Sequence, residues 1–294
     1  MSFKPKTQRF TGAHRNTLIG DAFGNRGQAV LLLHGGGQTR HAWLRTAEAI
    51  ARSGMTAYAV DQRGHGDSDW IDTGAYAFGD YAADARALAD QLAVHTGTRP
   101  IVVGASLGGI AALTAEGDAA RAGEPALFSA LVLVDITPRV DFSGIAKVQG
   151  FMRAHAREGF ASVEEAADAV AAYLPHRPRP RSHEGLQKNL RLHPDGRWRW
   201  HWDPRFLDSR RPDEAYRMTR EATLAESAKS LKMPVLLVRG ASSELVHENH
   251  AKEFLSLVPH ASYADVAGAR HMVAGDQNDQ FSTAILDFLN KLDH

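Results

Sequence analysis

Short apolar runs alternate along this chain with longer stretches in which alanine and leucine recur at helical spacing. Several runs are continuously apolar, as is typical of strands that are buried on both faces of a parallel sheet. The strands expected from these runs are Val30–Leu33, Thr56–Asp61, Ile101–Gly104, Leu131–Asp135, Val235–Gly240 and Ser262–Val266. An earlier pair of segments, Gln8–Gly12 and Thr17–Asp21, has the pattern of an antiparallel hairpin at the sheet edge.

Helical segments such as AWLRTAEAIARSG and DYAADARALADQLAVHTG fill the gaps between these strands. Strand–helix alternation of this kind predicts an α/β fold with a mostly parallel central sheet flanked by helices. The alternation stops between about Pro138 and Lys232, where the pattern is helical, and it resumes at Met233. We therefore expect a core domain formed by residues 1–137 and 233–294, with an inserted helical lid at 138–232.

The segment VVGASLGG places Ser106 between Gly104 and Gly108, after a strand and before the helical stretch LGGIAALTAEG. This strand–turn–helix context is the one that a Gly-x-Ser-x-Gly nucleophile requires. The turn strains the backbone at the serine, so its neighbours must be small. Ser106 is the predicted nucleophile, although the same pattern fits a loop serine that caps the helix.

A second glycine-rich stretch, LLLHGGGQTRHAW, follows the first apolar strand. Glycines here allow backbone N–H groups to approach a ligand closely, and acyl transfer needs two such donors on the oxyanion. We assign these donors to Gly36, with Gly37 as its alternative, and to Leu107, the residue after the nucleophile.

A serine hydroxyl needs a base, and the base needs a carboxylate that fixes its tautomer. His271, in VAGARHMVAG, lies after the last predicted strand and before the final helix, from where it can reach the sheet edge that carries Ser106. Two acids follow strands, Glu244 in LLVRGASSELV and Asp135 in LVLVDITP. The chain order serine, acid, histidine fits either. We favour Glu244 and keep Asp135 as the alternative.

Five motifs in this order, HGGG, DQRGHGDS, GASLGG, LLVRGASSELV and ARHMVAGDQND, resemble the α/β-hydrolase superfamily over Ala29–Thr137 and Met233–Leu292. The branch resembled contains capped esterases, C–C hydrolases and enol-lactonases. The resemblance implies that the acid lies in the GASSE loop, although aspartate is more usual there. It also implies that Asp61 and Arg63 are structural braces. Serine at 106, in place of the aspartate of epoxide and haloalkane hydrolases, implies an acyl-enzyme.

Composition narrows the choice of partners. The chain has 294 residues, no cysteine, and 34 basic against 34 acidic side chains. No basic stripe indicates a nucleic acid, and no apolar run is long enough to cross a bilayer. No apolar segment follows the basic N-terminus, so we expect no signal peptide and a cytoplasmic protein. No metal-ligand spacing is present, and we expect no metal and no cofactor.

The lid is expected to cover Ser106 and to shape an apolar pocket with Trp43, Met272 and His34 in its lining. We therefore predict a serine hydrolase that cleaves small, largely apolar carboxylic esters. The alternatives are a C–C hydrolase or lactonase with the same triad, and a ligand-binding receptor of this fold with little turnover. The natural substrate and the oligomeric state stay open.

Overall fold

The computed structural model describes residues 4–175, 182–208, 214–271 and 278–292, and it is built around an eight-stranded sheet. The sheet strands are β1 (Lys6–Thr11), β2 (Thr17–Phe23), β3 (Ala29–Leu33), β4 (Thr56–Val60), β5 (Ile101–Ala105), β6 (Ala130–Val134), β9 (Val235–Gly240) and β10 (Ser262–Val266). Each predicted strand is present, with bounds that differ by at most one residue at either end for the six apolar runs. The predicted edge hairpin corresponds to β1 and β2.

The strand order is β1-β2-β4-β3-β5-β6-β9-β10. The pairs β1–β2 and β2–β4 are antiparallel, whereas every pair from β4 to β10 is parallel. The mostly parallel sheet expected from the sequence is thus confirmed. Because parallel strands end at one edge, the loops after β3, β5, β6, β9 and β10 meet there.

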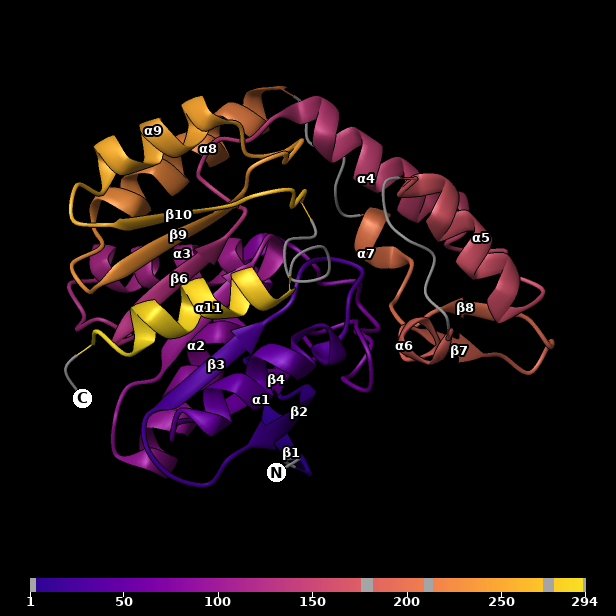
Figure 1. The fold of residues 1–294 in the computed structure, drawn as a ribbon, viewed down its shortest axis with the longest axis horizontal. Coiled ribbons are helices and arrows are strands. Elements are labelled where there is room, and N and C mark those ends of the chain that lie inside the picture. Colours follow the sequence, from indigo (N-terminus) through magenta and orange to yellow (C-terminus); the bar gives the residue numbers. More distant parts are fainter. Residues whose placement is uncertain (1–3, 176–181, 209–213, 272–277, 293–294) are drawn as a thin grey trace.

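Helices cover both faces of the sheet, which explains the continuously apolar strands. One face packs against α1 (Leu44–Arg52) and α11 (Asn278–Leu289), and the other against α2 (Phe78–Thr96), α3 (Leu107–Arg121), α8 (Glu214–Lys229) and α9 (Glu248–Leu257) (Figure 1). In β3, Leu31 and Leu33 face the second group, whereas Val30 and Leu32 face the first. Each such side chain, fully buried, stabilises the fold by about 1.5–3 kcal/mol.

The segment between β6 and α8, which contains the expected lid, lies beside the core at the right of Figure 1. Its elements are α4 (Phe142–Ala154), α5 (Val163–Tyr173), α6 (Glu184–Gln187), β7 (Leu190–Leu192), β8 (Trp198–Trp200) and α7 (Arg205–Asp208). The short strands β7 and β8 form an antiparallel hairpin. Its aromatic sequence packs inward, since Trp200 and Trp202 are buried.

Helix α8 lies within the range 138–232 that is expected to form the lid, but its packing is with the core. It packs against α3 on the face of the core, where Leu224 and Ala228 are buried. The two helices approach so closely that a Cβ atom added to Gly117 would lie 2.0 Å from Oγ of Ser227. The helical pattern of α8 shows which side of the helix is buried, but it does not show which element that side packs against. The pattern alone therefore groups α8 with the lid helices that precede it in the sequence.

Candidate active site

Ser106 stands at the sharp turn between β5 and α3. Its backbone has φ 45° and ψ −108°, a conformation that L residues rarely adopt. A Cβ atom added to Gly104 would lie 2.6 Å from the carbonyl group of Gly108, and one added to Gly108 would lie 2.4 Å from the carbonyl oxygen of Leu33. The turn therefore excludes a side chain at either glycine, as the sequence analysis predicts, and Ser106 carries backbone strain of about 1–3 kcal/mol.

Two backbone hydrogen bonds fix this turn between neighbouring strands. Ser106 N–H donates to the carbonyl of Val134, the last residue of β6, at 3.1 Å. Gly108 N–H donates to the carbonyl of His34, which directly follows β3, at 3.2 Å. Ser106 consequently lies at the carboxyl edge of the sheet, between the loops that follow β3 and β6.

The carboxylate that contacts the imidazole of His271 belongs to Asp135, the residue immediately after β6. His271 Nδ1 lies 2.8 Å from Asp135 Oδ2. The carboxylate is fully buried and also accepts the backbone N–H of Gly240 at 3.1 Å and the hydroxyl of Ser243 at 2.6 Å. A carboxylate held by three donors has a fixed orientation. It assigns the ring proton to Nδ1 and leaves Nε2 of His271 as the basic nitrogen.

Glu244 does not occupy this position, so the preference for Glu244 as the acid is corrected. Its Oε2 lies 3.5 Å from the backbone nitrogen of His271 and contacts neither ring nitrogen. The GASSE loop instead supplies the N–H of Gly240 and the hydroxyl of Ser243, which hold the carboxylate of Asp135 beside the imidazole. The alternative acid, Asp135, therefore stands beside the imidazole.

His271 reaches the sheet edge from the loop that follows β10. A carbonyl oxygen of this loop would lie 2.5 Å from a Cβ atom added to Gly240, so the loop packs on the end of β9. The imidazole side chain is 13% exposed. Both residues are fixed to the end of β6, Ser106 through Val134 and His271 through Asp135. A hydrogen bond from the serine hydroxyl to the imidazole stays a prediction.

Two backbone N–H groups beside Ser106, those of Gly36 and Leu107, have no acceptor in the described part of the chain. Leu107 is the first residue of α3, and its N–H is one of those that a helix N-terminus leaves unpaired. The glycine loop lies against the nucleophile, since a Cβ atom added to Gly35 would be 3.5 Å from Cβ of Ser106. Both groups therefore remain candidates for the oxyanion donors.

The alternative donor, Gly37, has its N–H occupied. It donates to Nε2 of His65 at 3.0 Å, and Nδ1 of His65 in turn donates to the carbonyl of Arg63 at 2.9 Å. Because the imidazole of His65 is fully buried, this contact fixes the glycine loop to the core. Among the two glycines considered, only Gly36 keeps its N–H available.

Of the three residues expected in the pocket lining, the structure describes His34 and Trp43, and both are buried. His34 is fully buried, where Nε2 accepts the backbone N–H of Gln62 at 3.0 Å and Nδ1 donates to the carbonyl of Gly35 at 2.8 Å. Burial lowers the pKa of His34, which keeps the ring neutral. Trp43 is 1% exposed and packs against Phe281 of α11, on the far face of the sheet. Met272 lies outside the described residues.

Lid residues contact the glycine loop instead. A Cβ atom added to Gly36 would lie 2.9 Å from Cζ of Phe206, and one added to Gly37 would lie 2.6 Å from Cε of Met152. Both side chains are buried. Sequence reasoning missed them because the packing of the lid on the core decides which of its apolar residues reach the loop. The aromatic run RWRWHWDPRF, which ends at Phe206, was the available signal.

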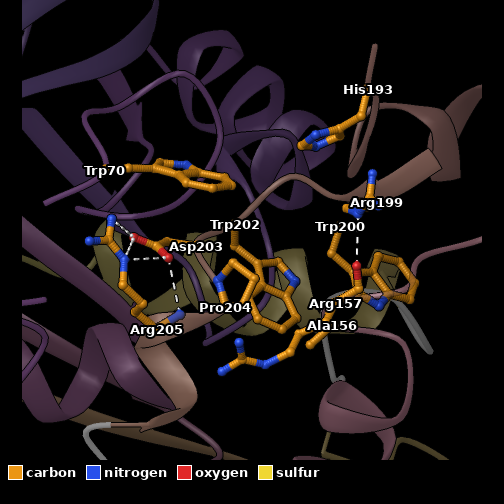
Figure 2. Close-up of a pocket in the computed structure, with 10 residues that line it drawn as sticks. All are labelled: Trp70, Ala156, Arg157, His193, Arg199, Trp200, Trp202, Asp203, Pro204 and Arg205. Atoms are coloured by element: carbon orange, nitrogen blue, oxygen red, sulfur yellow. Dashed lines mark hydrogen bonds and ion pairs between the residues drawn. The ribbon is translucent and has the colours of Figure 1, made fainter. Parts of the chain in front are cut away.

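A cavity of about 310 Å³ is lined by lid residues and by Trp70 of the loop between β4 and α2. Figure 2 shows Trp70, Trp200 and Trp202 in its lining, and it shows Asp203 joined to Arg205. The residues that line it include none of those at the serine site, and the ring of Trp202 faces Phe206 at 6.3 Å. The cavity adjoins the glycine loop through Trp202, whose Nε1 would lie 3.7 Å from a Cβ atom added to Gly37.

The motif DQRGHGDS has the structural role that the resemblance implies. Asp61 is fully buried and accepts hydrogen bonds from Arg40, which also contacts Asp21 at 2.9 Å. Arg63 is fully buried and forms two hydrogen bonds with the carboxylate of Asp84, at 2.6 and 2.7 Å. These ion pairs fix the loop that follows β4 to the neighbouring parts of the core.

The described residues contain no group of three or more histidine or acidic side chains arranged to hold a metal ion. None of the helices found in that part of the chain has the length and apolar character needed to span a bilayer.

Comparison with known proteins agrees with this geometry. The family model described as serine aminopeptidase, S33, matches residues 24–278. The esterase Rv0045c of Mycobacterium tuberculosis is 31% identical over 262 residues, which cover 87% of this chain and 80% of that protein. The 2-(acetamidomethylene)succinate hydrolase of Mesorhizobium japonicum is also 31% identical, over 80% of this chain and 79% of that protein.

Solved structures show the same architecture. The crystal structure of E-2-(acetamidomethylene)succinate hydrolase superposes with a TM-score of 0.82 and 25% identity, over 98% of this chain and all of that one. The matched residues include the strands from β3 to β10, the serine turn and the segment between β6 and α8. The chain is a hydrolase that belongs to the serine aminopeptidase S33 family of the α/β-hydrolase superfamily.

Proposed function

We propose that this protein is a carboxylesterase that works through an acyl-enzyme on Ser106. The observation that carries this proposal is the 2.8 Å contact between Asp135 and Nδ1 of His271, at the sheet edge where the strained serine turn ends β5. This contact leaves Nε2 to take a proton from a hydroxyl, which is the role that a serine nucleophile requires of its base.

The reaction follows from this arrangement. Ser106 Oγ attacks the ester carbonyl carbon while its proton passes to Nε2 of His271. The N–H groups of Gly36 and Leu107 donate to the oxyanion, and donors of this kind contribute about 3–4 kcal/mol each to transition-state stability. The tetrahedral intermediate collapses, and the imidazolium protonates the leaving alcohol. A water molecule, deprotonated by the same nitrogen, then attacks the acyl carbonyl carbon, and the Oγ–acyl bond breaks while the imidazolium returns the proton to Ser106 Oγ and the acid is released.

The surroundings of the glycine loop support an apolar acyl group. Phe206 and Met152 lie against Gly36 and Gly37, and Leu107 completes the apolar contact at 4.0 Å from a Cβ atom added to Gly36. The similarity to an esterase over most of the chain points the same way. Small esters of apolar acids are therefore the first substrates to test.

A second candidate uses the same three residues on a different bond. The relative from Mesorhizobium japonicum is named for a substituted succinate rather than for an ester. A lactone or an activated C–C bond would pass through the same acyl-enzyme. A panel of ester, lactone and vinylogous diketone substrates, compared by kcat/KM, separates these possibilities.

The decisive variant is Ser106→Ala. We expect it to lower hydrolysis of p-nitrophenyl butyrate by at least about 10³-fold, because the nucleophile is removed while donors and pocket remain. Ser256→Ala, an exposed serine on α9, serves as the matched control and is expected to retain full activity. Thermal unfolding of each variant checks the fold. Unchanged turnover by folded Ser106→Ala would reject the assignment.

Burst kinetics distinguish an enzyme from a receptor of the same fold. An esterase releases one equivalent of nitrophenol rapidly and then turns over steadily, whereas a receptor that merely acylates stops after the first equivalent. We expect steady turnover after any burst.

A further inference from the structure

Arg220 on α8 is a half-buried arginine without a carboxylate partner. In the described part of the chain its Nε has no acceptor, and no carboxylate oxygen lies within 4.0 Å of its nitrogens. Its contact is with the ring of Phe78, whose centroid is 4.8 Å from Cζ. The adjacent acid on its own helix, Glu221, pairs instead with Arg139 at 3.3 Å.

Three more deeply buried arginines of this protein each have the carboxylate partner that Arg220 lacks. Arg40, Arg63 and Arg239 have side chains that are at most 9% exposed, and each has a carboxylate oxygen within 2.9 Å. Burying part of a cation without a hydrogen-bonded carboxylate is costly, because the buried Nε loses its hydration and gains no acceptor. Burial accordingly lowers the pKa of Arg220. An anionic ligand at this position would remove that cost.

The helix packing places Arg220 near the nucleophile. Helix α8 leads into β9 and α3 follows β5, so both run from the carboxyl edge of the parallel sheet towards its opposite edge. Gly117 of α3 lies level with Ser227 of α8, where a Cβ atom would come within 2.0 Å of Oγ. Arg220 precedes Ser227 by seven residues, or about 10.5 Å. It is therefore level with the first or second turn of α3, the helix that begins directly after Ser106.

The side chain points further towards the reacting end. Helical side chains lean towards the helix N-terminus, which for α8 is the end at the carboxyl edge of the sheet. Arg220 meets Phe78, the first residue of α2, while α3 packs against both α2 and α8. The guanidinium thus lies over Phe78 at the start of α2, and Phe78 packs against the apolar cluster that also contains Ile110 of α3.

We propose that Arg220 binds a carboxylate of the substrate, so that the preferred esters are monoesters of short dicarboxylic acids. This inference rests on the proposed esterase activity, and it adds the charge of the acyl group. An acyl chain on Ser106 that runs along the apolar start of α3 would bring a distal carboxylate to the guanidinium. Arg220 is then a substrate-binding residue rather than a packing residue.

Two esters of equal shape test the proposal. Monomethyl glutarate carries a distal carboxylate, and methyl 5-methylhexanoate carries an isopropyl group in its place. We expect the wild-type protein to have at least a tenfold higher kcat/KM for the monoanion, measured in a pH-stat at neutral pH. Equal or faster turnover of the neutral ester would overturn the proposal without any variant.

Arg220→Met keeps the length of the stem over Phe78 and removes the charge. We expect it to lower kcat/KM for monomethyl glutarate at least tenfold, or about 1.4 kcal/mol, and to change the neutral ester less than about twofold. Arg217→Met is the matched control, because Arg217 also stacks on a ring, that of Phe142 at 4.2 Å, and pairs with Glu214. Equal losses with both esters, or an equal effect of the control, would overturn the proposal.

Binding separates this inference from the esterase assignment. Calorimetric titration of monomethyl glutarate into Ser106→Ala measures affinity without turnover, and we expect Arg220→Met in that background to weaken Kd at least tenfold. Unchanged Kd contradicts the role of Arg220 even where the esterase assignment holds. Unchanged turnover by Ser106→Ala would instead contradict the nucleophile, while the affinity comparison still judges Arg220. Should Arg220→Met not fold, Arg220→Lys keeps the charge and is expected to retain the preference for the monoanion.

Discussion

Asp135 joins two properties that single it out among the acids of this chain. It is fully buried, and its φ of 48° lies in the left-handed region. Ser106, on the neighbouring strand end, also has a positive φ, whereas the third such non-glycine residue in the described chain, Arg15, lies in the hairpin turn between β1 and β2. Strain of this kind persists only where the surroundings impose it. Its occurrence at both positions fits a site that holds its side chains in fixed places.

The first prediction concerns the choice of carboxylate. We expect Asp135→Asn to lower kcat for p-nitrophenyl butyrate on the order of 10³–10⁴-fold, because an amide at this position no longer favours the proton on Nδ1 of His271. Glu244→Gln, which keeps an acceptor near the backbone of His271, is expected to cost less than about tenfold. Steady-state kinetics at neutral pH decide between them, and a larger loss in Glu244→Gln would restore it as the acid.

A second residue-scale prediction concerns His34 and pH. Burial lowers its pKa in the folded protein below the ordinary value of 6.5, so the unfolded chain binds the proton more readily. Its share of the stability is present above pH 6.5 and is lost as the pH falls below that value. His41, His201 and His250 also have lowered pKa values and contribute in the same direction.

The measurement is the unfolding temperature between pH 7.5 and pH 5.5. The wild-type protein is expected to lose stability over this range, and His34→Gln, which cannot take up a proton, is expected to lose less. His95→Gln, at an exposed position on α2, is the control for the substitution itself. An identical pH slope in wild type and His34→Gln would show that His34 contributes nothing.

At the scale of elements, the approach of α3 to α8 depends on a missing side chain. A Cβ atom added to Gly117 would lie 2.0 Å from Oγ and 2.4 Å from Cβ of Ser227. Alanine ordinarily stabilises a helix relative to glycine by about 1 kcal/mol. Here the overlap outweighs that gain, so Gly117→Ala is expected to destabilise the protein by about 1–3 kcal/mol.

The control for this prediction is Gly150→Ala in α4, where no atom lies within 4 Å of an added Cβ and a gain of up to about 1 kcal/mol is expected. Denaturant unfolding measures both changes. Adding Ser227→Gly to Gly117→Ala is expected to recover part of the loss, since it removes the overlapping atoms. Stabilisation by Gly117→Ala alone would contradict the close packing of the two helices.

The elements also show how far the sequence predicts this fold. The strands were predictable because burial on both faces requires unbroken apolar runs, and the turn at Ser106 was predictable because only small residues fit beside it. The acid was not, because Asp135 and Glu244 both follow strands, and only the contacts that the loop after β9 makes with Asp135 separate them. Likewise, the sequence around Trp43 indicates a buried aromatic residue, but it does not indicate on which face of the sheet the indole packs.

At the scale of the whole molecule, the lid and the core meet at the glycine loop. Phe206 comes from the lid after the β7–β8 hairpin, while Gly36 comes from the core after β3. The ring of Phe206 also contacts His65 at 4.9 Å and Tyr81 at 6.1 Å, so it joins the lid to the residues that fix the loop. The space over the expected oxyanion site is therefore set by how the lid sits on the core.

This arrangement predicts that Phe206 limits the size of the acyl group. Phe206→Ala removes the ring that lies 2.9 Å from an added Cβ at Gly36, and the space opened adjoins the N–H expected to hold the oxyanion. We expect kcat/KM for p-nitrophenyl octanoate to rise relative to the butyrate by roughly five- to tenfold, which matches about 1–1.4 kcal/mol of added apolar contact. Stability is expected to fall by about 3–5 kcal/mol, so the assay belongs well below the unfolding temperature. Phe142→Ala, a lid phenylalanine that is 37% exposed, is the control and is expected to leave the ratio unchanged. If Phe206→Ala shifts the ratio no more than this control does, the lid ring does not border the acyl site.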